Sequence, residues 1–269
     1  MITERSSPHE VIFEPPKPCG TAVLTLAGSS GRIDTERARL LARHGALAMS
    51  LRWFGGEGQQ PAPWHVPLET FFDALDRLAP ECDRLVVMGT SFGAEAALLT
   101  ATHHSGVDAA IGFSPSSVVW GHTNRKSHWT LGGVELPFVP LDEDWEPADD
   151  PPAVVGWYRR SLESAKRCHS SAVIAVESIP EVMLVAGGDD QVWPSTYFAT
   201  AIAERRSEYG LSTTVISSPG AGHRTVLPDE AAVTGGIPMA RGGSIEADKE
   251  LGDKTWPLLA ACLRLQLSE

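Results

Sequence analysis

The chain has 269 residues, a formal net charge of −12 at pH 7 and 42% hydrophobic residues. This length and composition allow a sizeable core within one α/β domain. The negative charge argues against nucleic acid and anionic membrane surfaces as partners. No apolar run approaches the length of a membrane span, and residues 1–20 contain charges and prolines where a secretion signal has an apolar segment, so we expect a cytoplasmic protein.

The cysteines are isolated from one another in the sequence and form no Cys-x-x-Cys pair; they are Cys19, Cys82, Cys168 and Cys262. Isolated cysteines in such a chain are typical of reduced thiols. We therefore expect no disulfide framework, no metal site and no cofactor.

Apolar runs alternate with helical patterns through the first part of the chain. Continuous apolar runs predict strands over 21–26, 46–51, 85–88 and 108–113. Apolar side chains at helical spacing predict helices over 34–44, 68–78 and 94–104. Continuous apolar strands that alternate with helices are typical of a parallel sheet covered on both faces.

This alternation stops after Ser117. Residues 118–176 are rich in tryptophan, histidine, proline and acidic residues, which indicates an excursion from the sheet. Beyond it the alternation resumes, with strands predicted over 181–186 and 213–216 and helices over 195–209 and 247–267. The sequence has no internal repeat and no low-complexity linker. It therefore predicts one α/β domain over residues 1–269, with a lid inserted over 118–176.

Residues 89–93 read Gly-Thr-Ser-Phe-Gly, directly after one apolar run and directly before a helical one. Strand, Gly-x-Ser-x-Gly and helix in this order are the layout of a nucleophile elbow, in which a strained turn exposes the serine hydroxyl. A Cβ at either glycine position would collide as strand and helix pack together. Ser91 is therefore the candidate nucleophile; the alternative is an ordinary serine N-cap.

A serine nucleophile needs a general base and an acid that orients this base. In α/β hydrolases the acid and then the histidine follow the serine along the chain, each in a loop after a later strand. The loop after the strand 181–186 contains Asp189 and Asp190. We prefer Asp190, because a valine and a proline follow it at the spacing usual in hydrolases. The loop after the strand 213–216 ends at His223, the candidate base.

The oxyanion of a tetrahedral intermediate needs two oriented N–H donors. We expect one to be the amide of Phe92, the residue after the nucleophile. We expect the other from the loop 28–31 (Gly-Ser-Ser-Gly), with Ser29 as first choice and Ser30 in reserve; the alternative for this loop is a simple tight turn. Glu95, in the first turn of the elbow helix, is interpreted as structural, because the helix dipole stabilises a carboxylate there.

Aromatic residues of the excursion predict a small core of the lid, part of which lines an apolar cleft over the elbow. As substrate-binding residues we select Trp120 and Trp129 and, beside the candidate acid, Trp193. The excursion also holds three basic pairs, which are interpreted either as solvated charge or as a patch that holds phosphate groups: Arg125-Lys126, Arg159-Arg160 and Lys166-Arg167.

These motifs resemble the catalytic domain of acyl-CoA thioesterases and bile acid-CoA:amino acid N-acyltransferases. The resemblance runs from about residue 20 to the C-terminus and rests on the segments 28–34, 37–42, 114–121, 136–140, 187–195 and 219–223. It implies an α/β-hydrolase fold with Ser91, Asp190 and His223 as the triad. It also implies an acyl thioester substrate, carried by coenzyme A or by an acyl carrier protein, and an acyl-enzyme on Ser91.

Two departures from this family affect the expected function. The animal enzymes carry an N-terminal β-sandwich domain, whereas only about twenty residues precede the expected hydrolase domain here. The amino acid acyltransferases use a cysteine nucleophile, so the serine at position 91 favours hydrolysis. We therefore expect a thioesterase. The alternatives are a carboxylesterase or dienelactone-hydrolase-like enzyme, an acyltransferase to an amine, and a non-catalytic binding protein; the oligomeric state is not predicted.

Overall fold

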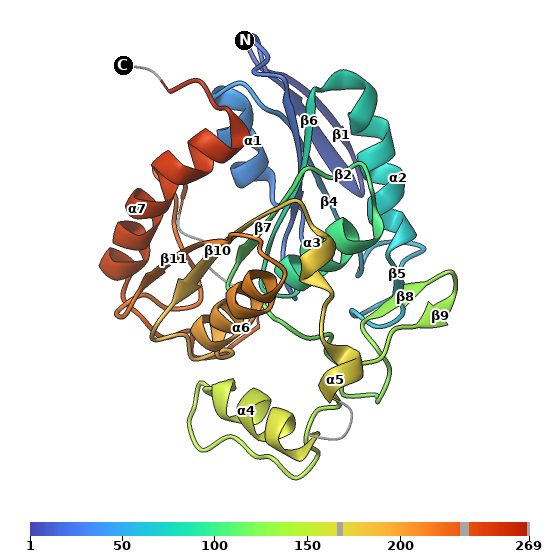
Figure 1. Cartoon of the computed structure of the whole chain (residues 1–269), viewed down its shortest axis with the longest axis vertical. Coiled ribbons are helices and arrows are strands. Elements are labelled where there is room, and N and C mark those ends of the chain that lie inside the picture. The colour runs from blue at the N-terminus through green and yellow to red at the C-terminus, as the bar shows by residue number, and fades with distance from the viewer. Residues whose placement is uncertain (166–168, 232–236, 268–269) are drawn as a thin grey trace.

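An eight-stranded sheet forms the centre of the computed structural model, which describes residues 1–165, 169–231 and 237–267 (Figure 1). Its strands, in sheet order, are β1 (Thr3–Ser7), β2 (Glu10–Glu14), β4 (Leu47–Leu51), β3 (Thr21–Leu26), β6 (Arg84–Thr90), β7 (Ala109–Phe113), β10 (Glu181–Gly187) and β11 (Thr214–Ser218). The six strands from β4 to β11 are parallel, while β2 pairs antiparallel with β4 and with β1. The sheet is therefore mostly parallel, as predicted.

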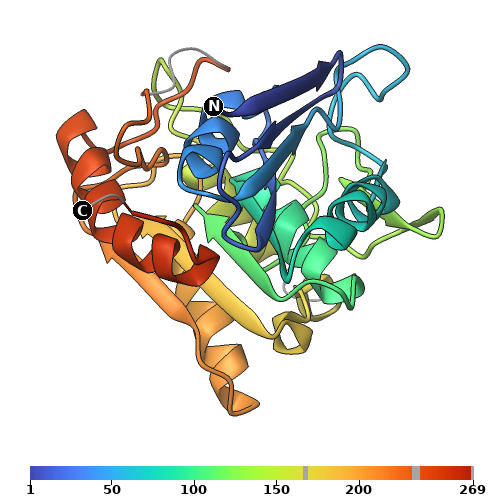
Figure 2. The same ribbon diagram turned by 90° about the horizontal axis from the view of Figure 1, so that it is seen from above.

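Helices cover both faces of this sheet (Figure 2). One face is covered by α1 (Thr35–Arg43) and α7 (Ile245–Leu263), and the other by α2 (Glu69–Leu78), α3 (Phe92–His103) and α6 (Ser195–Glu208). Successive side chains of a strand point to opposite faces. Accordingly, Val23 belongs to the buried cluster on the face of α1 and α7, while its neighbour Leu24 belongs to the cluster on the opposite face.

The N-terminal segment adds a hairpin to the sheet, which the sequence analysis did not predict. β2 pairs with β4 and buries Val11, Ile12 and Phe13, whereas the side chains of β1 are exposed along its whole length. A run of three apolar residues is too short to distinguish a strand from a loop. The main sheet therefore begins before residue 20, near which the resemblance placed the start of the hydrolase domain.

Residues 118–176 leave the main sheet between β7 and β10. They contain β8 (Trp129–Leu131), β9 (Val134–Glu135), α4 (Val155–Ser164), α5 (His169–Ala172) and the first residue of a 3-10 turn, η2 (Val176–Ser178). β8 and β9 form a separate small sheet with β5 (Val66–Pro67), which lies between β4 and α2 in the chain. A second 3-10 turn, η1 (Ala79–Glu81), follows α2. Figure 1 shows α4 outside the layers that enclose the main sheet.

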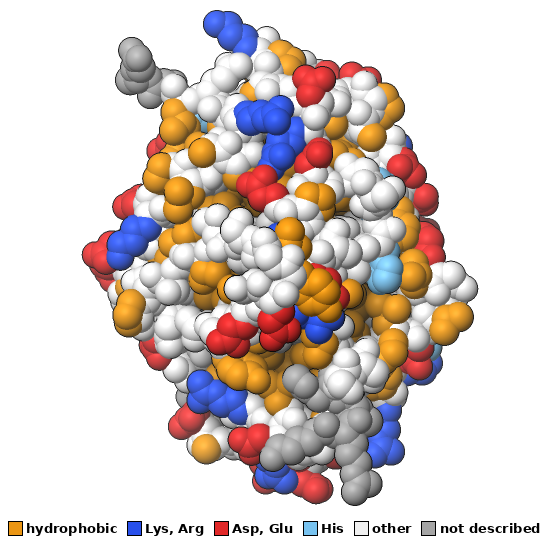
Figure 3. All heavy atoms as spheres, in the orientation of Figure 1, with side chains coloured by type: hydrophobic (Ala, Val, Ile, Leu, Met, Phe, Trp, Pro, Cys, Tyr) orange, Lys and Arg blue, Asp and Glu red, His pale blue; other side chains and the backbone are white. Residues whose placement is uncertain are grey.

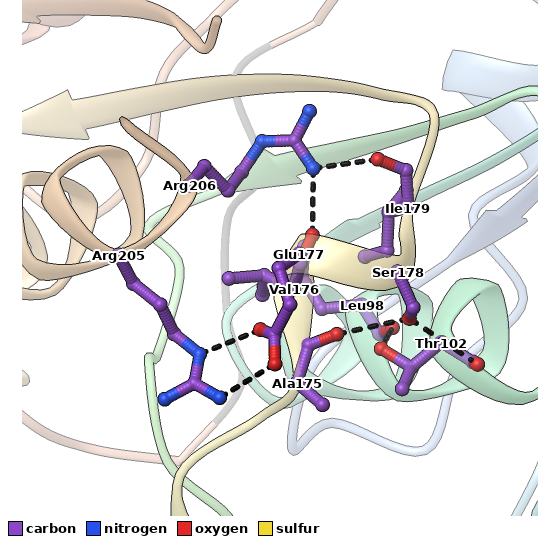
Figure 4. A network of polar contacts seen from close by, with 9 residues as sticks. All are labelled: Leu98, Thr102, Ala175, Val176, Glu177, Ser178, Ile179, Arg205 and Arg206. Atoms are coloured by element: carbon purple, nitrogen blue, oxygen red, sulfur yellow. Dashed lines mark hydrogen bonds and ion pairs between the residues drawn. The ribbon is translucent and has the colours of Figure 1, made fainter. Parts of the chain in front are cut away.

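Two arginines of α6 hold the point at which the excursion returns to the sheet (Figure 4). The guanidinium of Arg206 is fully buried and donates to the carbonyl oxygens of Val176 and Ile179, each at 2.6 Å. Arg205 forms an ion pair with Glu177 through two nitrogen–oxygen contacts of 2.6 Å. These contacts attach the chain before β10 to α6, and β10 leads directly into the loop that carries Asp190.

The structure also bears on the predictions about cysteines, metal sites and membrane spans. The thiols of Cys19, Cys82 and Cys262 are free, while Cys168 and the pair Lys166-Arg167 lie outside the described residues. Residues 1–165, 169–231 and 237–267 contain no group of three or more histidine, cysteine, aspartate or glutamate side chains that could hold a metal ion. Within the same ranges, no helix has the length and apolarity to cross a membrane.

Candidate active site

Ser91 lies in a strained turn between β6 and α3, with φ 59° and ψ −126°. Residues other than glycine rarely adopt a positive φ. The two flanking glycines allow the close packing that holds it: a Cβ on Gly89 would lie 1.9 Å from the carbonyl oxygen of Gly93, and a Cβ on Gly93 would lie 2.3 Å from that of Leu26. The Ser91 side chain makes no capping hydrogen bond to α3. The geometry is that of a nucleophile elbow rather than of an ordinary N-cap.

Asp190, in the loop after β10, contacts the histidine directly. Its Oδ2 lies 2.8 Å from Nδ1 of His223 and also accepts a hydrogen bond from the Ser195 hydroxyl. Its Oδ1 accepts from the backbone N–H groups of Val192, at 2.8 Å, and Trp193, at 3.2 Å. The carboxylate is thus fixed on both oxygens.

Asp189 has different partners. Its Oδ1 accepts from the side-chain amide of Gln191 at 2.7 Å, and its Oδ2 accepts from the backbone N–H of Gly243 at 2.8 Å. These contacts join the loop after β10 to the loop before α7. The geometry therefore assigns Asp189 to loop structure and brings Asp190 to the histidine.

His223 is held by its main chain as well as by Asp190. Its N–H donates to the carbonyl oxygen of Arg241 at 2.9 Å, and its own carbonyl accepts from the Ser114 hydroxyl at 2.9 Å. Because Nδ1 faces a carboxylate, this nitrogen carries the proton and Nε2 is left as the basic nitrogen. His223 and Ser91 line the same cavity.

The expected oxyanion loop also lies at this cavity. Ser29 and Ser30 both line it, together with Ser91 and Phe92. A Cβ on Gly28 would lie 3.0 Å from the Cβ of Ser91, so the loop backbone passes close to the serine. Phe92 is the first residue of α3, and the N–H groups of a first helical turn have no partner within the helix. Both N–H sources proposed from the sequence thus border the serine.

The cavity has a volume of about 580 Å³. Its floor consists of loops that follow the carboxyl ends of β3, β6, β10 and β11, where the ligand sites of parallel sheets form. Much of its wall is apolar and comes in part from the excursion, through Leu141, Val154, Trp157 and Tyr158. A pocket of this size and composition fits a small apolar group with a few polar contacts.

Of the three tryptophans selected from the sequence, only Trp193 lines the cavity. Trp120 is fully buried, and its indole N–H donates to the Ser116 hydroxyl at 3.0 Å. Trp129 is also fully buried, and its indole N–H donates to Glu95 at 2.7 Å. The structure therefore corrects the substrate-binding assignment of Trp120 and Trp129: both belong to cores, because the β8 region folds back onto α3.

Glu95 connects the elbow helix to this region. Its Oε1 accepts from the backbone N–H of Trp120 at 3.0 Å and from the indole of Trp129. Complete burial raises the pKa of Glu95 to about 8. These contacts agree with a structural role for Glu95. The reason for this role is the buried link between α3 and the segment of Trp120 and Trp129, which the position of one residue in the sequence cannot reveal.

The two basic pairs of the excursion that the structure describes, Arg125-Lys126 and Arg159-Arg160, do not line the cavity. Arg125 forms an ion pair with Glu143, Arg160 forms one with Asp142 at 3.0 Å, and Lys126 and Arg159 are exposed. On the face shown in Figure 3, basic and acidic side chains are interspersed. These described residues fit the interpretation as solvated charge.

Sequence reasoning missed a buried ion pair beneath the elbow. Nε and Nη2 of Arg37 contact the two carboxylate oxygens of Glu230 at 2.9 and 2.7 Å, and Nη1 donates to the hydroxyl of Thr90 at 3.1 Å. Arg37 and Glu230 both line the cavity, and their side chains are 7% and 5% exposed. They are 193 residues apart, so no local pattern links them.

Comparison with known proteins identifies a family for this chain. Residues 66–267 match the protein family described as BAAT / Acyl-CoA thioester hydrolase C terminal. The acyl-coenzyme A amino acid N-acyltransferase 2 of Mus musculus is 25% identical over 259 residues, which cover 91% of this chain and 60% of that protein. The acyl-coenzyme A thioesterase 1 of Homo sapiens is 28% identical over 221 residues, which cover 79% of this chain and 51% of that protein. The chain therefore spans only half to three fifths of the length of these relatives.

Solved structures share the fold at low identity. A Klebsiella pneumoniae protein assigned as a dienelactone hydrolase has a TM-score of 0.58 and 14% identity, with 98% of both chains covered. An acylaminoacyl peptidase of Pyrococcus horikoshii has a TM-score of 0.59 and 10% identity, with 100% of this chain and 42% of that chain covered. These likenesses confirm the predicted α/β-hydrolase fold.

Proposed function

Because the chain belongs to the BAAT / acyl-CoA thioester hydrolase C-terminal family, we propose that it is a serine-dependent thioesterase. Its substrate would be an acyl group carried by coenzyme A or by an acyl carrier protein. One observation carries the proposal: Ser91, at a positive φ, shares a cavity with His223, whose Nδ1 is bound by Asp190.

The proposed reaction begins when Oγ of Ser91 attacks the thioester carbonyl carbon and Nε2 of His223 accepts the hydroxyl proton. The N–H of Phe92 and an N–H of the loop 28–31 stabilise the negative oxygen of the tetrahedral intermediate. The carbon–sulfur bond then breaks and the thiolate leaves; the proton held by His223 passes to it afterwards, which gives the free thiol and a neutral imidazole. Water, activated by the same nitrogen, releases the acyl group as a carboxylic acid and restores Ser91.

The excursion has a proposed role as a lid over this reaction. Trp157 and Tyr158 of α4 face the cavity that contains Ser91. An apolar wall of this kind shields the acyl group and limits access of bulk water. The predicted lid over 118–176 thus remains our proposal, with α4 rather than Trp120 or Trp129 as its substrate-facing part.

The proposal is tested with a panel of acyl-CoA thioesters and the oxygen esters of the same acids. A thiolate is a weak base and leaves without assistance, whereas an alkoxide depends more on proton transfer from His223. We expect larger kcat/KM values for the thioesters. The substitution Ser91→Ala should lower kcat by about 10⁴- to 10⁶-fold, as in other triads. Equal or better rates on oxygen esters would refute the thioesterase proposal, and full activity of Ser91→Ala would refute the nucleophile.

Transfer of the acyl group to an amine is the second candidate, because the similar Mus musculus protein is an amino acid N-acyltransferase. The two reactions share the acyl-enzyme and differ in the acceptor. Mass spectrometry of the products with an amino acid in the assay separates them. An N-acyl amino acid as the main product would replace hydrolysis by transfer.

A further inference from the structure

Arg37 joins the two segments that carry the proposed nucleophile and the proposed base. It belongs to α1, and its side chain is 7% exposed. Its Nη1 donates to the hydroxyl of Thr90, the residue before Ser91, at 3.1 Å. Its Nη2 donates to the carbonyl oxygen of Thr225, which follows His223 closely in the chain, also at 3.1 Å. One buried guanidinium therefore bonds to the chain beside both residues.

Glu230 attaches the segment after His223 to this arginine a second time. Its two carboxylate oxygens contact Nε and Nη2 of Arg37 at 2.9 and 2.7 Å. The oxygen that contacts Nη2 also accepts from the backbone N–H of Leu227 at 3.0 Å. Paired contacts between a guanidinium and a carboxylate fix orientation as well as distance. Arg37 and Glu230 thus form one rigid link between the elbow and the chain beyond His223.

Arg37 also contacts the residue that holds the main chain of Ser91. Its Cζ lies 4.5 Å from the ring centroid of Phe113, the last residue of β7. Phe113 is the register partner of Thr90 in the sheet, and its carbonyl oxygen accepts the Ser91 N–H at 2.9 Å. A guanidinium over an aromatic face is attracted by the ring. Arg37 therefore touches both residues from which the Ser91 turn departs.

Stability alone is a weak reason for a charged pair at this place. Burial lowers the pKa of Arg37, but the charge and hydrogen bonds of Glu230 outweigh this effect and raise the pKa above its usual value, so the guanidinium stays charged. An apolar pair of similar volume is often as stable as a buried ion pair. What an apolar side chain cannot supply is a fork of donors that spans several segments at once.

Ser91 depends on such support because its turn is strained. Its φ of 59° and ψ of −126° are rare for a residue other than glycine. Strained residues persist only where the surrounding structure holds them. Proton transfer from the serine hydroxyl to His223 also requires the two side chains to meet at hydrogen-bond distance. That distance depends on how the elbow and the histidine loop are held relative to each other.

We propose that Arg37, together with Glu230, is a positioning residue of the reaction, which fixes the Ser91 turn relative to the histidine loop. It acts through Thr90 and the segment of Thr225, so that its loss slows the reaction of Ser91 without weakening substrate binding. The inference rests on the proposed function in taking Ser91 and His223 as nucleophile and base. It does not depend on the substrate being a thioester.

Two substitutions of Thr90 test the link while the ion pair stays in place. Thr90→Val removes the hydroxyl that accepts from Arg37 and keeps the shape of the side chain, whereas Thr90→Ser keeps the hydroxyl. We expect Thr90→Val to lower kcat by about tenfold at unchanged KM, since a hydrogen bond to a charged group contributes roughly that factor or more. Thr90→Ser should match the wild-type protein. A wild-type kcat for Thr90→Val, or a rise in KM alone, would overturn the proposal.

Arg37→Lys keeps a positive charge opposite Glu230 but cannot reach all the acceptors of the guanidinium. It should lower kcat by about 10²-fold, the loss that a small misplacement of reacting groups causes. The double variant with Thr90→Val should lose no more than Arg37→Lys alone, because both changes break the same link. Losses that multiply in the double variant would show that Thr90 acts independently, which would overturn the link.

A fluorophosphonate probe tests the inference without a thioester. Its phosphorus forms a bond to Oγ of Ser91, fluoride leaves, and His223 accepts the hydroxyl proton, so the labelling rate reports on the same two side chains. The rate should fall in Thr90→Val and Arg37→Lys by the same factors as kcat. Labelling of both variants at the wild-type rate would overturn the inference. Labelling that falls in the variants, although the wild-type protein turns over no thioester, would refute the thioesterase proposal and support the positioning role.

Arg84→Gln is the matched control for a loss of stability. Arg84 lies at the start of β6, the strand that ends at Thr90, and its side chain is 12% exposed. It forms an ion pair with Glu181 and donates to the carbonyl oxygen of Cys262 at 2.9 Å. The control should lower Tm and leave kcat and the labelling rate unchanged. If it lowers both rates as much as Arg37→Lys at an equal loss of Tm, the effect is general destabilisation and the proposal is overturned.

Discussion

Asp189 and Asp190 are adjacent and chemically identical, but their side chains point in different directions and contact different partners. Asp190 lies 5% exposed against His223, while Asp189 joins two loops through Gln191 and Gly243. The contact between Asp190 and Nδ1 of His223 selects the tautomer in which Nε2 can accept a proton. The partners of each carboxylate are thus decided by the direction of its side chain.

The substitutions Asp190→Asn and Asp189→Asn form a matched pair. The first replaces the acceptor of the Nδ1 proton by an amide, which favours the wrong tautomer, and should lower kcat by about 10⁴-fold, as the same change does in a serine protease. The second leaves His223 and its partner intact and should change kcat by only a few-fold. Steady-state rates measured on one thioester decide between them. A larger loss for Asp189→Asn would reverse the assignment of the acid.

At the scale of elements, the elbow helix is joined to the excursion by one buried carboxyl group. Glu95 of α3 binds the backbone of Trp120 and the indole of Trp129 in β8. Within the described residues its Oε2 has no hydrogen-bond partner, so burial is not compensated on that oxygen. The helix that follows Ser91 and the segment that contains Trp120 and Trp129 are therefore coupled through a group whose charge depends on pH.

This coupling predicts a pH dependence of stability. The pKa of Glu95 is about 8 in the folded protein against 4.5 ordinarily, so the native state keeps a proton that the unfolded chain has lost. Stability from this group is complete below about pH 4.5 and is lost as the pH rises towards about 8. The loss between pH 4.5 and pH 7 is on the order of 3 kcal/mol.

Glu95→Gln keeps an acceptor for Trp129 and has no proton to lose. Thermal or urea unfolding between pH 5 and pH 8 should therefore show a weaker decline for this variant than for the wild-type protein. Glu36→Gln serves as control, because Glu36 is an exposed carboxylate in the first turn of α1. Parallel stability profiles for Glu95→Gln and the wild-type protein would contradict a proton held by Glu95.

At the scale of the whole molecule, the main sheet continues beyond its parallel part into an N-terminal hairpin. β2 covers the edge of β4 and buries Val11, Ile12 and Phe13, while β1 contributes only exposed side chains. An uncovered strand edge is a site for pairing with other chains. β2 is therefore part of the core, and β1 is an extension of it.

Two deletions separate these contributions. Removal of residues 1–14 exposes the β4 edge and removes three buried side chains, which should cost roughly 5 kcal/mol and lower Tm by roughly 10–20 °C. Removal of residues 1–7 alone should lower Tm by only a few degrees, because β1 buries no side chain. Calorimetry and light scattering check both. Similar Tm values for the two truncated proteins would show that β2 contributes little.

The sequence alone was sufficient for the elements whose signal is local. Continuous apolar runs predicted the parallel strands, and the bounds agree within one or two residues at strands such as β3 and β7. Gly89 and Gly93 indicated the elbow, because a close approach of backbones excludes a Cβ wherever it occurs. The order of Ser91, Asp190 and His223 followed from strand ends, which a parallel sheet brings to one edge.

Only the tertiary structure decided which side chains face the cavity. Trp120 and Trp157 belong to the same aromatic excursion, yet one is fully buried and the other lines the cavity. The arginines at positions 32, 224 and 241 have no common local pattern, yet all three line the cavity, because it is formed by loops that are distant in the sequence. The spacing of apolar residues along the chain indicates whether a side chain is buried. The direction it faces, and what it meets there, depends on segments that are distant in the chain.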